Sequence, residues 1–160
     1  MVKQLLFIVS FGMLVFACGK EPDNGQLQEV KVLSGNYSDC LGTTKSLNLA
    51  EEESYVIRAI GGSNYLIEHK NASFNCCLPE GIAFSASTGS DTIFFTDYEK
   101  IAGNCRCICK YNTNAEIGEI EEGSYLLYLT TGETFVGSVQ LNFKPDMYVE
   151  IPVSDLAESS

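Results

Sequence analysis

The chain has 160 residues, and its 21 acidic residues outnumber its 10 basic ones, so that the net charge is −11. A surface this acidic argues against nucleic acid as a partner and against electrostatic binding to anionic lipid headgroups. Once the N-terminal segment described next is set aside, the remaining length suits one domain with a single hydrophobic core.

Residues 1–17 are predicted to form a secretory signal peptide. Lys3 supplies a positive charge, and residues 5–17 are an apolar run that Ser10 and Gly12 interrupt. This run is shorter than the roughly 20 residues of a membrane-spanning helix. The chain becomes polar directly after Cys18, which is typical of a cleavage site. We therefore expect an exported protein.

The end of this run, Val15-Phe16-Ala17-Cys18, resembles the lipobox of bacterial lipoproteins. In that family the cysteine thiol receives a diacylglycerol, the signal peptide is cut before the cysteine, and the new amine is acylated. The resemblance implies that Cys18 is the lipid attachment site and that the membrane is a partner through this anchor. More than one acyl chain makes such an attachment stable.

The expected location is the outer membrane. Residues 20–23, Lys-Glu-Pro-Asp, loosely resemble the acidic signal that sends Bacteroidetes-type lipoproteins to the cell surface. Both the cell surface and the periplasmic face remain open. Residues 18–28 form the acylated cysteine and a polar tether, residues 29–154 a single β domain, and residues 155–160 a polar tail.

Strand patterns dominate the domain. Residues 135–143 alternate between two faces, with Phe135, Gly137, Val139, Leu141 and Phe143 on one of them. Two glycine-containing breaks, at residues 61–62 and 132–133, predict hairpins. The expected inward sets of the first hairpin are Tyr55, Ile57 and Ala59, then Tyr65 and Ile67. The expected strands are residues 29–33, 54–60, 64–70, 82–86, 92–96, 105–110, 124–131, 135–143 and 148–153.

Short strands at about ten-residue spacing predict an all-β fold, a two-sheet sandwich. Residues 117–129 are similar to the segment that leads into a Gly-x-Tyr strand in many immunoglobulin-like and fibronectin-like modules. The resemblance implies an immunoglobulin-like sandwich, and a small β-barrel is the alternative.

Six cysteines remain after Cys18, and an even number in an exported chain favours disulfides. If residues 105–110 form a strand, Cys105, Cys107 and Cys109 share one face and lie too far apart to bond one another. A bridge between the adjacent Cys76 and Cys77 would be strained. We expect two bridges from this pair to the triplet and a third from Cys40 to the triplet. Six connectivities stay open.

These cysteines have three other interpretations. Structural zinc sites prefer two to four residues between the cysteines of each pair, and only Cys105 and Cys109 have such a spacing, so no metal site is expected. A redox site would need a Cys-x-x-Cys motif, which is missing from the sequence. Reduced cysteines packed as small apolar side chains are the remaining alternative.

No pattern of catalytic residues stands out, and we expect neither an enzyme nor a cofactor. His69 is the single histidine, and nothing in the sequence places it beside a cysteine nucleophile. Carboxylates cluster at predicted turns, where solvated charge is ordinary. Asp91-Thr92-Ile93 resembles the acceptor of Bacteroidetes-type O-glycosylation, which makes Thr92 a candidate modification site.

The cysteine pattern over residues 75–129, an adjacent pair followed by Cys-x-Cys-x-Cys-x-Tyr, resembles uncharacterised small lipoproteins of gut Bacteroidetes. The resemblance implies fold and location and no known activity. The resulting hypothesis is a lipid-anchored, disulfide-stapled binding or adhesion module for an unknown protein or glycan ligand. A structural accessory subunit of an outer-membrane assembly and a thiolate metal-handling envelope protein are the alternatives.

Overall fold

The computed structural model describes residues 29–43 and 52–157. The expected signal peptide, Cys18 and the tether lie outside these residues. Within the described ranges, no helix is long and apolar enough to cross a membrane.

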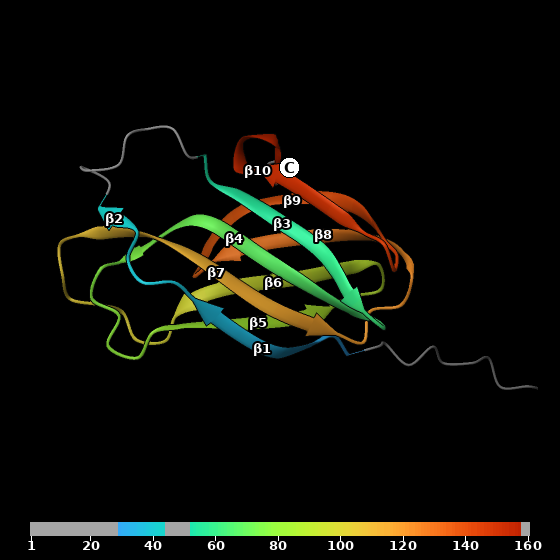
Figure 1. Cartoon of the computed structure of the whole chain (residues 1–160), viewed down its shortest axis with the longest axis horizontal. Helices are drawn as coiled ribbons and strands as arrows, with labels where there is room; N and C mark the ends of the chain where they lie inside the picture. The colour runs from blue at the N-terminus through green and yellow to red at the C-terminus, as the bar shows by residue number, and fades with distance from the viewer. Residues whose placement is uncertain (1–28, 44–51, 158–160) are drawn as a thin grey trace, which may run out of the picture.

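The described chain folds into two stacked β-sheets, as Figure 1 shows. The expected all-β two-sheet sandwich is therefore confirmed, and the sheets are open rather than closed into a barrel. The first sheet contains, in order, β1 (Lys31–Tyr37), β7 (Ile108–Gly118), β4 (Asn64–Asn75), β3 (Ser54–Gly61) and β10 (Tyr148–Pro152), and the short β2 (Gly42–Thr43) also pairs with β7. The second sheet contains β5 (Ile82–Thr88), β6 (Thr92–Glu99), β8 (Gly123–Thr131) and β9 (Thr134–Phe143).

Neighbouring strands are antiparallel, except that β6 and β8 run parallel. This exception has a topological cause, because the chain leaves the second sheet after β6, adds β7 to the first sheet and returns as β8. The expected strand over residues 124–131 forms β8, which lies between β6 and β9. After β10 a single 3-10 turn spans Val153–Asp155.

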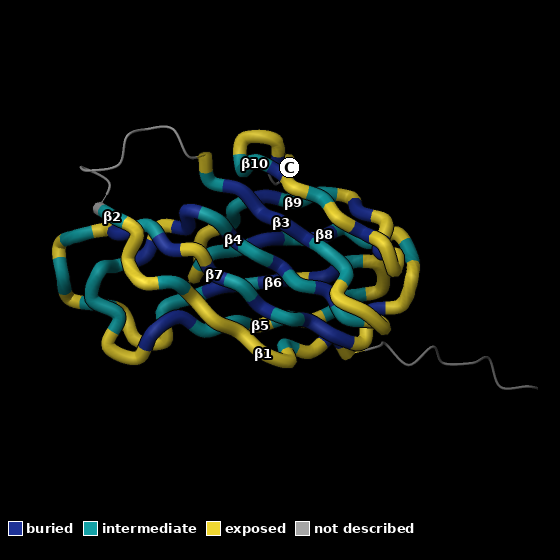
Figure 2. The backbone as a smooth tube through the Cα atoms, in the orientation of Figure 1, coloured by how far each residue is buried: buried dark blue, intermediate teal, exposed yellow. Residues whose placement is uncertain are grey.

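The core forms where the inward faces of the two sheets meet (Figure 2). Period-two alternation places the apolar side chains of each strand on that side. The expected inward residues of the first hairpin are confirmed, and Tyr55, Ile57, Tyr65 and Ile67 are almost fully buried while Ala59 packs against them. From the other sheet the core receives Ile93, Phe95, Leu127, Leu129, Leu141 and Phe143.

Both expected hairpins form at their glycines. Gly61 and Gly62 connect β3 to β4 with φ angles of 111° and 60°, and Gly132 connects β8 to β9 with φ of 58°. A residue with a Cβ atom is strained at such angles, so glycine is required at these turns.

The strand predicted over residues 105–110 is partly wrong. β7 begins at Ile108 and runs on to Gly118, so that Cys105 and Cys107 lie in the preceding loop and Cys109 alone belongs to the strand. Other bounds also differ. β1 spans Lys31–Tyr37 rather than residues 29–33, β4 continues to Asn75, and β5 and β6 extend to Thr88 and Glu99. β4 and β7 pair along most of their lengths, and this mutual pairing extends both strands beyond their local sequence patterns.

The predicted inward position of Phe135 is also wrong. A register shift between Leu129 and Thr130 places Phe135 opposite Thr130, an outward residue, and its ring contacts the outward ring of Tyr128. A bulge of this kind turns a side chain to the other face of the sheet. Gly137, Val139, Leu141 and Phe143 keep the inward orientation.

Two residues of the expected polar tail, Leu156 and Ala157, pack onto the sandwich. Leu156 is buried against Gly137, and Ala157 pairs with Ser138 at the edge of β9. A Cβ atom at position 137 would overlap the Cβ atom of Leu156, so that glycine is what admits this leucine.

We expect Gly137→Ala to lower the free energy of unfolding by roughly 1–3 kcal/mol, because the added methyl group overpacks the Leu156 contact. Urea titration measures this loss. In a Leu156→Ala background the same substitution should cost clearly less, since the overlapping side chain is gone. An equal cost in both backgrounds would contradict the contact.

Candidate functional site

Three disulfides form at one end of the sandwich. The structure joins Cys40 to Cys109, Cys76 to Cys107 and Cys77 to Cys105, with Cα atoms 5.7, 5.6 and 5.7 Å apart. This is one of the six connectivities that the sequence left open. It has the expected form, since two bridges join the adjacent pair to the triplet and the third reaches Cys40.

The geometry behind the pairing survives although the triplet is not wholly a strand. Exposure alternates through the segment, with Arg106 and Ile108 exposed and the three cysteines more buried. The adjacent Cys76 and Cys77 follow the end of β4, and the N–H of Cys76 donates to the carbonyl of Cys107 at 3.2 Å. The two cysteine segments therefore lie side by side, as partner segments must to form two bridges.

Asn75 holds the two cysteine loops together without covalent bonds. Its amide Nδ2 donates to the carbonyls of Gly103 (3.2 Å) and Cys105 (2.8 Å), and its Oδ1 accepts from the N–H of Cys77 (2.9 Å). The carboxylate of Glu99 accepts from the N–H groups of Asn75 (2.7 Å) and Gly103 (3.2 Å). One amide and one carboxylate thus satisfy five backbone groups in and beside these loops.

The sulfur atoms of Cys76, Cys77 and Cys105 all lie within 4.8 Å of one another. Three thiolates at such distances form a donor set suited to a soft metal ion. In the structure each of these sulfurs is bonded to another cysteine, and a metal ligand must be a thiolate. The described arrangement is that of a covalent staple.

A buried polar network connects the two sheets a short way inside this end. His69 of β4 is 1% exposed and Asp97 of β6 is 0% exposed. The Nδ1 atom of His69 lies 2.8 Å from Oδ2 of Asp97, and its Nε2 atom lies 3.0 Å from Oε1 of Glu53. Asp97 also accepts hydrogen bonds from the hydroxyls of Thr131 (2.8 Å) and Thr113 (3.2 Å).

The network favours a protonated imidazole. Burial lowers the pKa of His69, but the hydrogen bonds to Asp97 and Glu53 outweigh burial and hold this pKa above its ordinary value. Burial raises the pKa of Glu53, but its bonds to His69 and Lys110 prevail and the net pKa is lowered. Lys110 donates to Glu53 at 3.0 Å. Both pKa shifts mean that the surroundings favour the charged forms of His69 and Glu53.

The ring of Tyr55 covers one side of this network. It stacks on the imidazole of His69 with ring centroids 4.0 Å apart. Burial, and then the charge of Asp97, raise the pKa of Tyr55 well above its ordinary range, so that the phenol stays neutral. His69 is therefore enclosed in the protein. Its hydrogen-bonded partners, Asp97 and Glu53, are not linked to each other by any of the three disulfides.

Sequence reasoning missed this network, although its signal was present. His69 continues the inward series of Tyr65 and Ile67, and Asp97 continues the inward series of Ile93 and Phe95. An ionisable residue at an inward position of an alternating strand requires a buried partner. Two such positions on different strands therefore indicate a pair.

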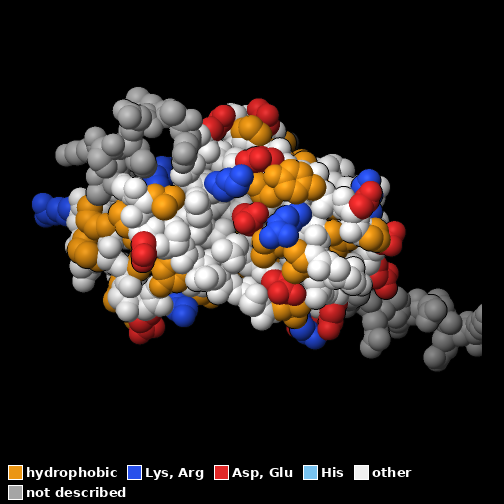
Figure 3. All heavy atoms as spheres, in the orientation of Figure 1, with side chains coloured by type: hydrophobic (Ala, Val, Ile, Leu, Met, Phe, Trp, Pro, Cys, Tyr) orange, Lys and Arg blue, Asp and Glu red, His pale blue; other side chains and the backbone are white. Residues whose placement is uncertain are grey.

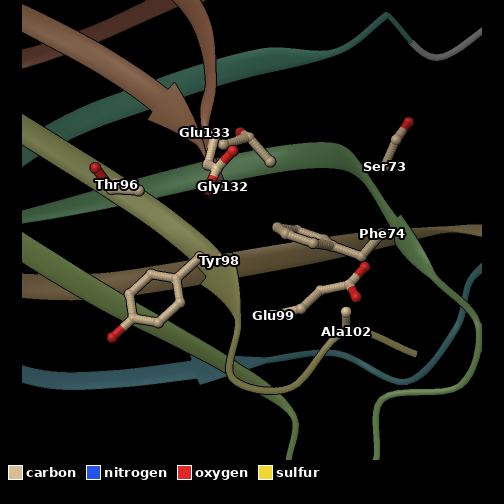
Figure 4. A pocket seen from close by; sticks show the side chains of 9 residues that line it. Ser73, Phe74, Thr96, Tyr98, Glu99, Ala102, Gly132 and Glu133 are labelled. Carbon is tan, nitrogen blue, oxygen red and sulfur yellow. The ribbon is translucent and has the colours of Figure 1, made fainter. Parts of the chain in front are cut away.

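A cavity of about 590 Å³ opens beside the network, between the end of β8 and the last residues of β6. Its walls combine aromatic, hydroxyl and carboxylate side chains. Figure 4 shows Phe74 and Glu99 close together on one wall, Gly132 and Glu133 at the β8–β9 turn, and Tyr98 directed away from Phe74. The volume falls within the range of small-molecule sites.

The remaining candidate residue of the described chain, Thr92, begins β6 at the end of the sandwich away from the disulfides. It is partly exposed, and its hydroxyl lies 3.5 Å from Oδ1 of Asp91. The position is accessible, and whether it carries a glycan stays a prediction. Comparison with protein-family models, curated proteins and solved structures finds no match to this chain.

The buried network predicts a defined pH dependence of stability. Its stabilisation is complete below the ordinary His pKa of 6.5 and declines as pH rises through the raised pKa of folded His69. Glu53 contributes above its ordinary pKa of 4.5, and this part is lost as pH falls through its lowered pKa. The network is therefore strongest between these two values.

We expect His69→Gln to lower the free energy of unfolding by about 3 kcal/mol near pH 5.5, because a buried carboxylate loses its charged partner. The loss should shrink at pH 9, and urea titration at both pH values measures it. Lys70→Gln, on the same strand but facing solvent, is the matched control and should cost at most about 1 kcal/mol at either pH. A His69→Gln cost independent of pH would count against a protonated imidazole.

The connectivity predicts which thiol each cysteine variant releases. Cys76→Ser should free Cys107, and Cys77→Ser should free Cys105. Trypsin cleaves after Arg106 and so separates the two positions for mass spectrometry after alkylation. The unmodified protein should show no alkylated cysteine among these six residues, and release of the opposite thiol would disprove the pairing.

Proposed function

We propose that the chain is a lipid-anchored protein of the bacterial cell envelope, and that its disulfide-stapled sandwich is a non-catalytic binding module. In this proposal residues 1–17 are removed, Cys18 carries the lipid in the outer membrane, and the described domain displays a ligand-binding surface. The resemblance of residues 15–18 to a lipobox supports the anchor.

The observation that carries the proposal is that the start of β1 and the cysteine-bearing loops lie at opposite ends of the sandwich. β1 begins at Lys31 opposite Gly118, whereas Cys109 lies near the other end of β7. The start of β1 and the cysteine-bearing loops therefore occupy opposite ends of the domain (Figure 1). At about 3.3 Å per residue, the nine residue steps of β7 from Cys109 to Gly118 separate these ends by roughly 30 Å. A chain anchored at its N-terminus would hold the stapled loops and the cavity away from the membrane.

The chemistry of the described residues also supports a binding role. The six cysteines of the domain are consumed in bridges, and the single histidine is enclosed between two carboxylates. The alternative of a thiolate metal-handling protein would require Cys76, Cys77 and Cys105 to be reduced. The thiol count described above decides between these two proposals.

We expect Cys18→Ala to abolish incorporation of labelled palmitate and to release the protein from the membrane fraction, because no acylated thiol remains. Fractionation of expressing cells, followed by immunoblotting, measures the release. Cys40→Ala is the matched control, since it removes a bridge and leaves the anchor. Retention of both label and membrane attachment in Cys18→Ala would refute the lipid anchor.

A further inference from the structure

The outer face of the four-stranded sheet carries a row of aromatic rings. Phe94 of β6, Tyr128 of β8 and Phe135 of β9 point outward on three neighbouring strands. The ring centroids of Phe94 and Tyr128 lie 5.5 Å apart, and those of Tyr128 and Phe135 lie 4.4 Å apart. Phe94 is 42% exposed, while the other two are partly exposed. The three rings form a continuous surface, which we term the aromatic row.

Within the described strands of this sheet, the outward side chains around the aromatic row carry no charge, and the nearby carboxylates of Asp91 and Glu133 lie in the turns. In the described strands β5, β6, β8 and β9, every outward side chain is that of Ala, Ser, Thr, Leu, Phe, Tyr, Gln or Asn. This composition is unusual for a chain whose net charge is −11. The opposite sheet behaves differently, because its outer face carries the ion pairs of Arg58 with Glu68 and of Lys70 with Glu150. Figure 3 shows that charged face.

The polar groups on the uncharged face are hydroxyls and amides. Ser85 and Thr96 are partners across β5 and β6, the hydroxyls of Thr96 and Thr130 are hydrogen-bonded across β6 and β8, and Gln140 donates to Ser124 across β8 and β9. Such groups both donate and accept hydrogen bonds. An uncharged, hydroxyl-rich face offers no counter-ion, so it matches a neutral partner that is itself rich in hydroxyls.

Aromatic rings identify the class of that partner. The face of an aromatic ring is electron-rich and attracts the weakly positive C–H groups of an apolar surface laid upon it. A pyranose ring presents C–H groups on its faces and hydroxyls at its rim. Rings beside hydroxyls and amides therefore match a saccharide, and a row of rings across three strands is long enough to contact more than one sugar unit.

The face also continues into the cavity described above. Thr96 and Tyr98 belong to the outer face of β6 and at the same time line that cavity. We propose that this face binds a neutral glycan chain, with sugar units over the aromatic row and one end of the chain in the cavity. This inference rests on the proposed function, whose ligand class it names.

Affinity electrophoresis tests the proposal with the protein purified in detergent. Native gels containing starch, dextran, xylan or galactomannan, one in each gel, serve as neutral probes, and alginate serves as the anionic probe. We expect at least one neutral polysaccharide to retard the protein and alginate to leave its mobility unchanged. Failure of all four neutral probes, or retardation by alginate alone, would overturn the proposal.

Substitution of the rings locates the binding surface. Phe94→Ala and Tyr128→Ala should each weaken the interaction about tenfold or more, because each removes a stacking platform. Phe94→Tyr should retain it. Tyr148→Ala is the matched control, since this tyrosine is 64% exposed on the opposite sheet. These side chains lie at the surface, and melting temperatures equal to that of the unmodified protein establish that each variant is folded. Equal weakening by Tyr148→Ala would contradict the assigned surface.

Thr92 allows a further distinction, because it lies on the same face as Phe94. If the native protein fails to bind while Thr92→Val binds, the occupant of the face is the chain's own glycan, and the proposal of a separate glycan ligand is wrong. The two proposals can fail separately. The aromatic variants test glycan binding, and they should stay attached to the membrane whether or not they bind. Release of Cys18→Ala from the membrane tests the lipid anchor alone.

Discussion

The buried pair of His69 and Asp97 is the constraint on which the arrangement of the two sheets depends. Asp97 has no access to water, so its charge must be compensated inside the protein. The compensation comes from both layers, with His69 and Thr113 in one sheet and Thr131 beside Asp97 in the other. Apolar side chains tolerate small sliding between sheets, whereas hydrogen bonds of about 3 Å do not. The network therefore sets how the sheets face each other, and Tyr55 shields it.

Much of the fold was predictable because each half-buried strand has a clear period of two. The inward series of β3 and β4 and the glycine hairpins depend on local sequence alone. The start of β7 and the orientation of Phe135 were not predictable, since the first depends on pairing with β4 and the second on a bulge against β8. In the candidate site, sequence spacing indicated how the cysteines could pair. Which member of the adjacent pair meets which partner depends on loops that only tertiary contacts define.

The two outer faces of the sandwich differ in chemistry although the same chain forms both. One face carries paired charges between β3, β4 and β10, which keep that surface soluble at little energetic gain. The other lacks charge along its strands and exposes aromatic rings. Exposed apolar surface is costly in water, and a contiguous patch generally marks an interaction site. The asymmetry separates a charged face from the uncharged face for which we propose recognition, and the disulfides lie at one end of the sandwich.

The hydrogen bonds of Asn75 have a consequence for how the protein acquires its covalent structure. The sulfurs of Cys76, Cys77 and Cys105 lie within 4.8 Å of one another, and Cys107 is bonded to Cys76, so thiol–disulfide exchange could produce an isomer with Cys76 bonded to Cys105 and Cys77 bonded to Cys107. Asn75 binds the backbone of Cys77 and of Cys105 at the same time, and so brings forward the native partners. A single neutral amide thereby favours one pairing of the cysteines over its exchanged isomer. Correct oxidation should then depend on this side chain being in place before the second bridge closes.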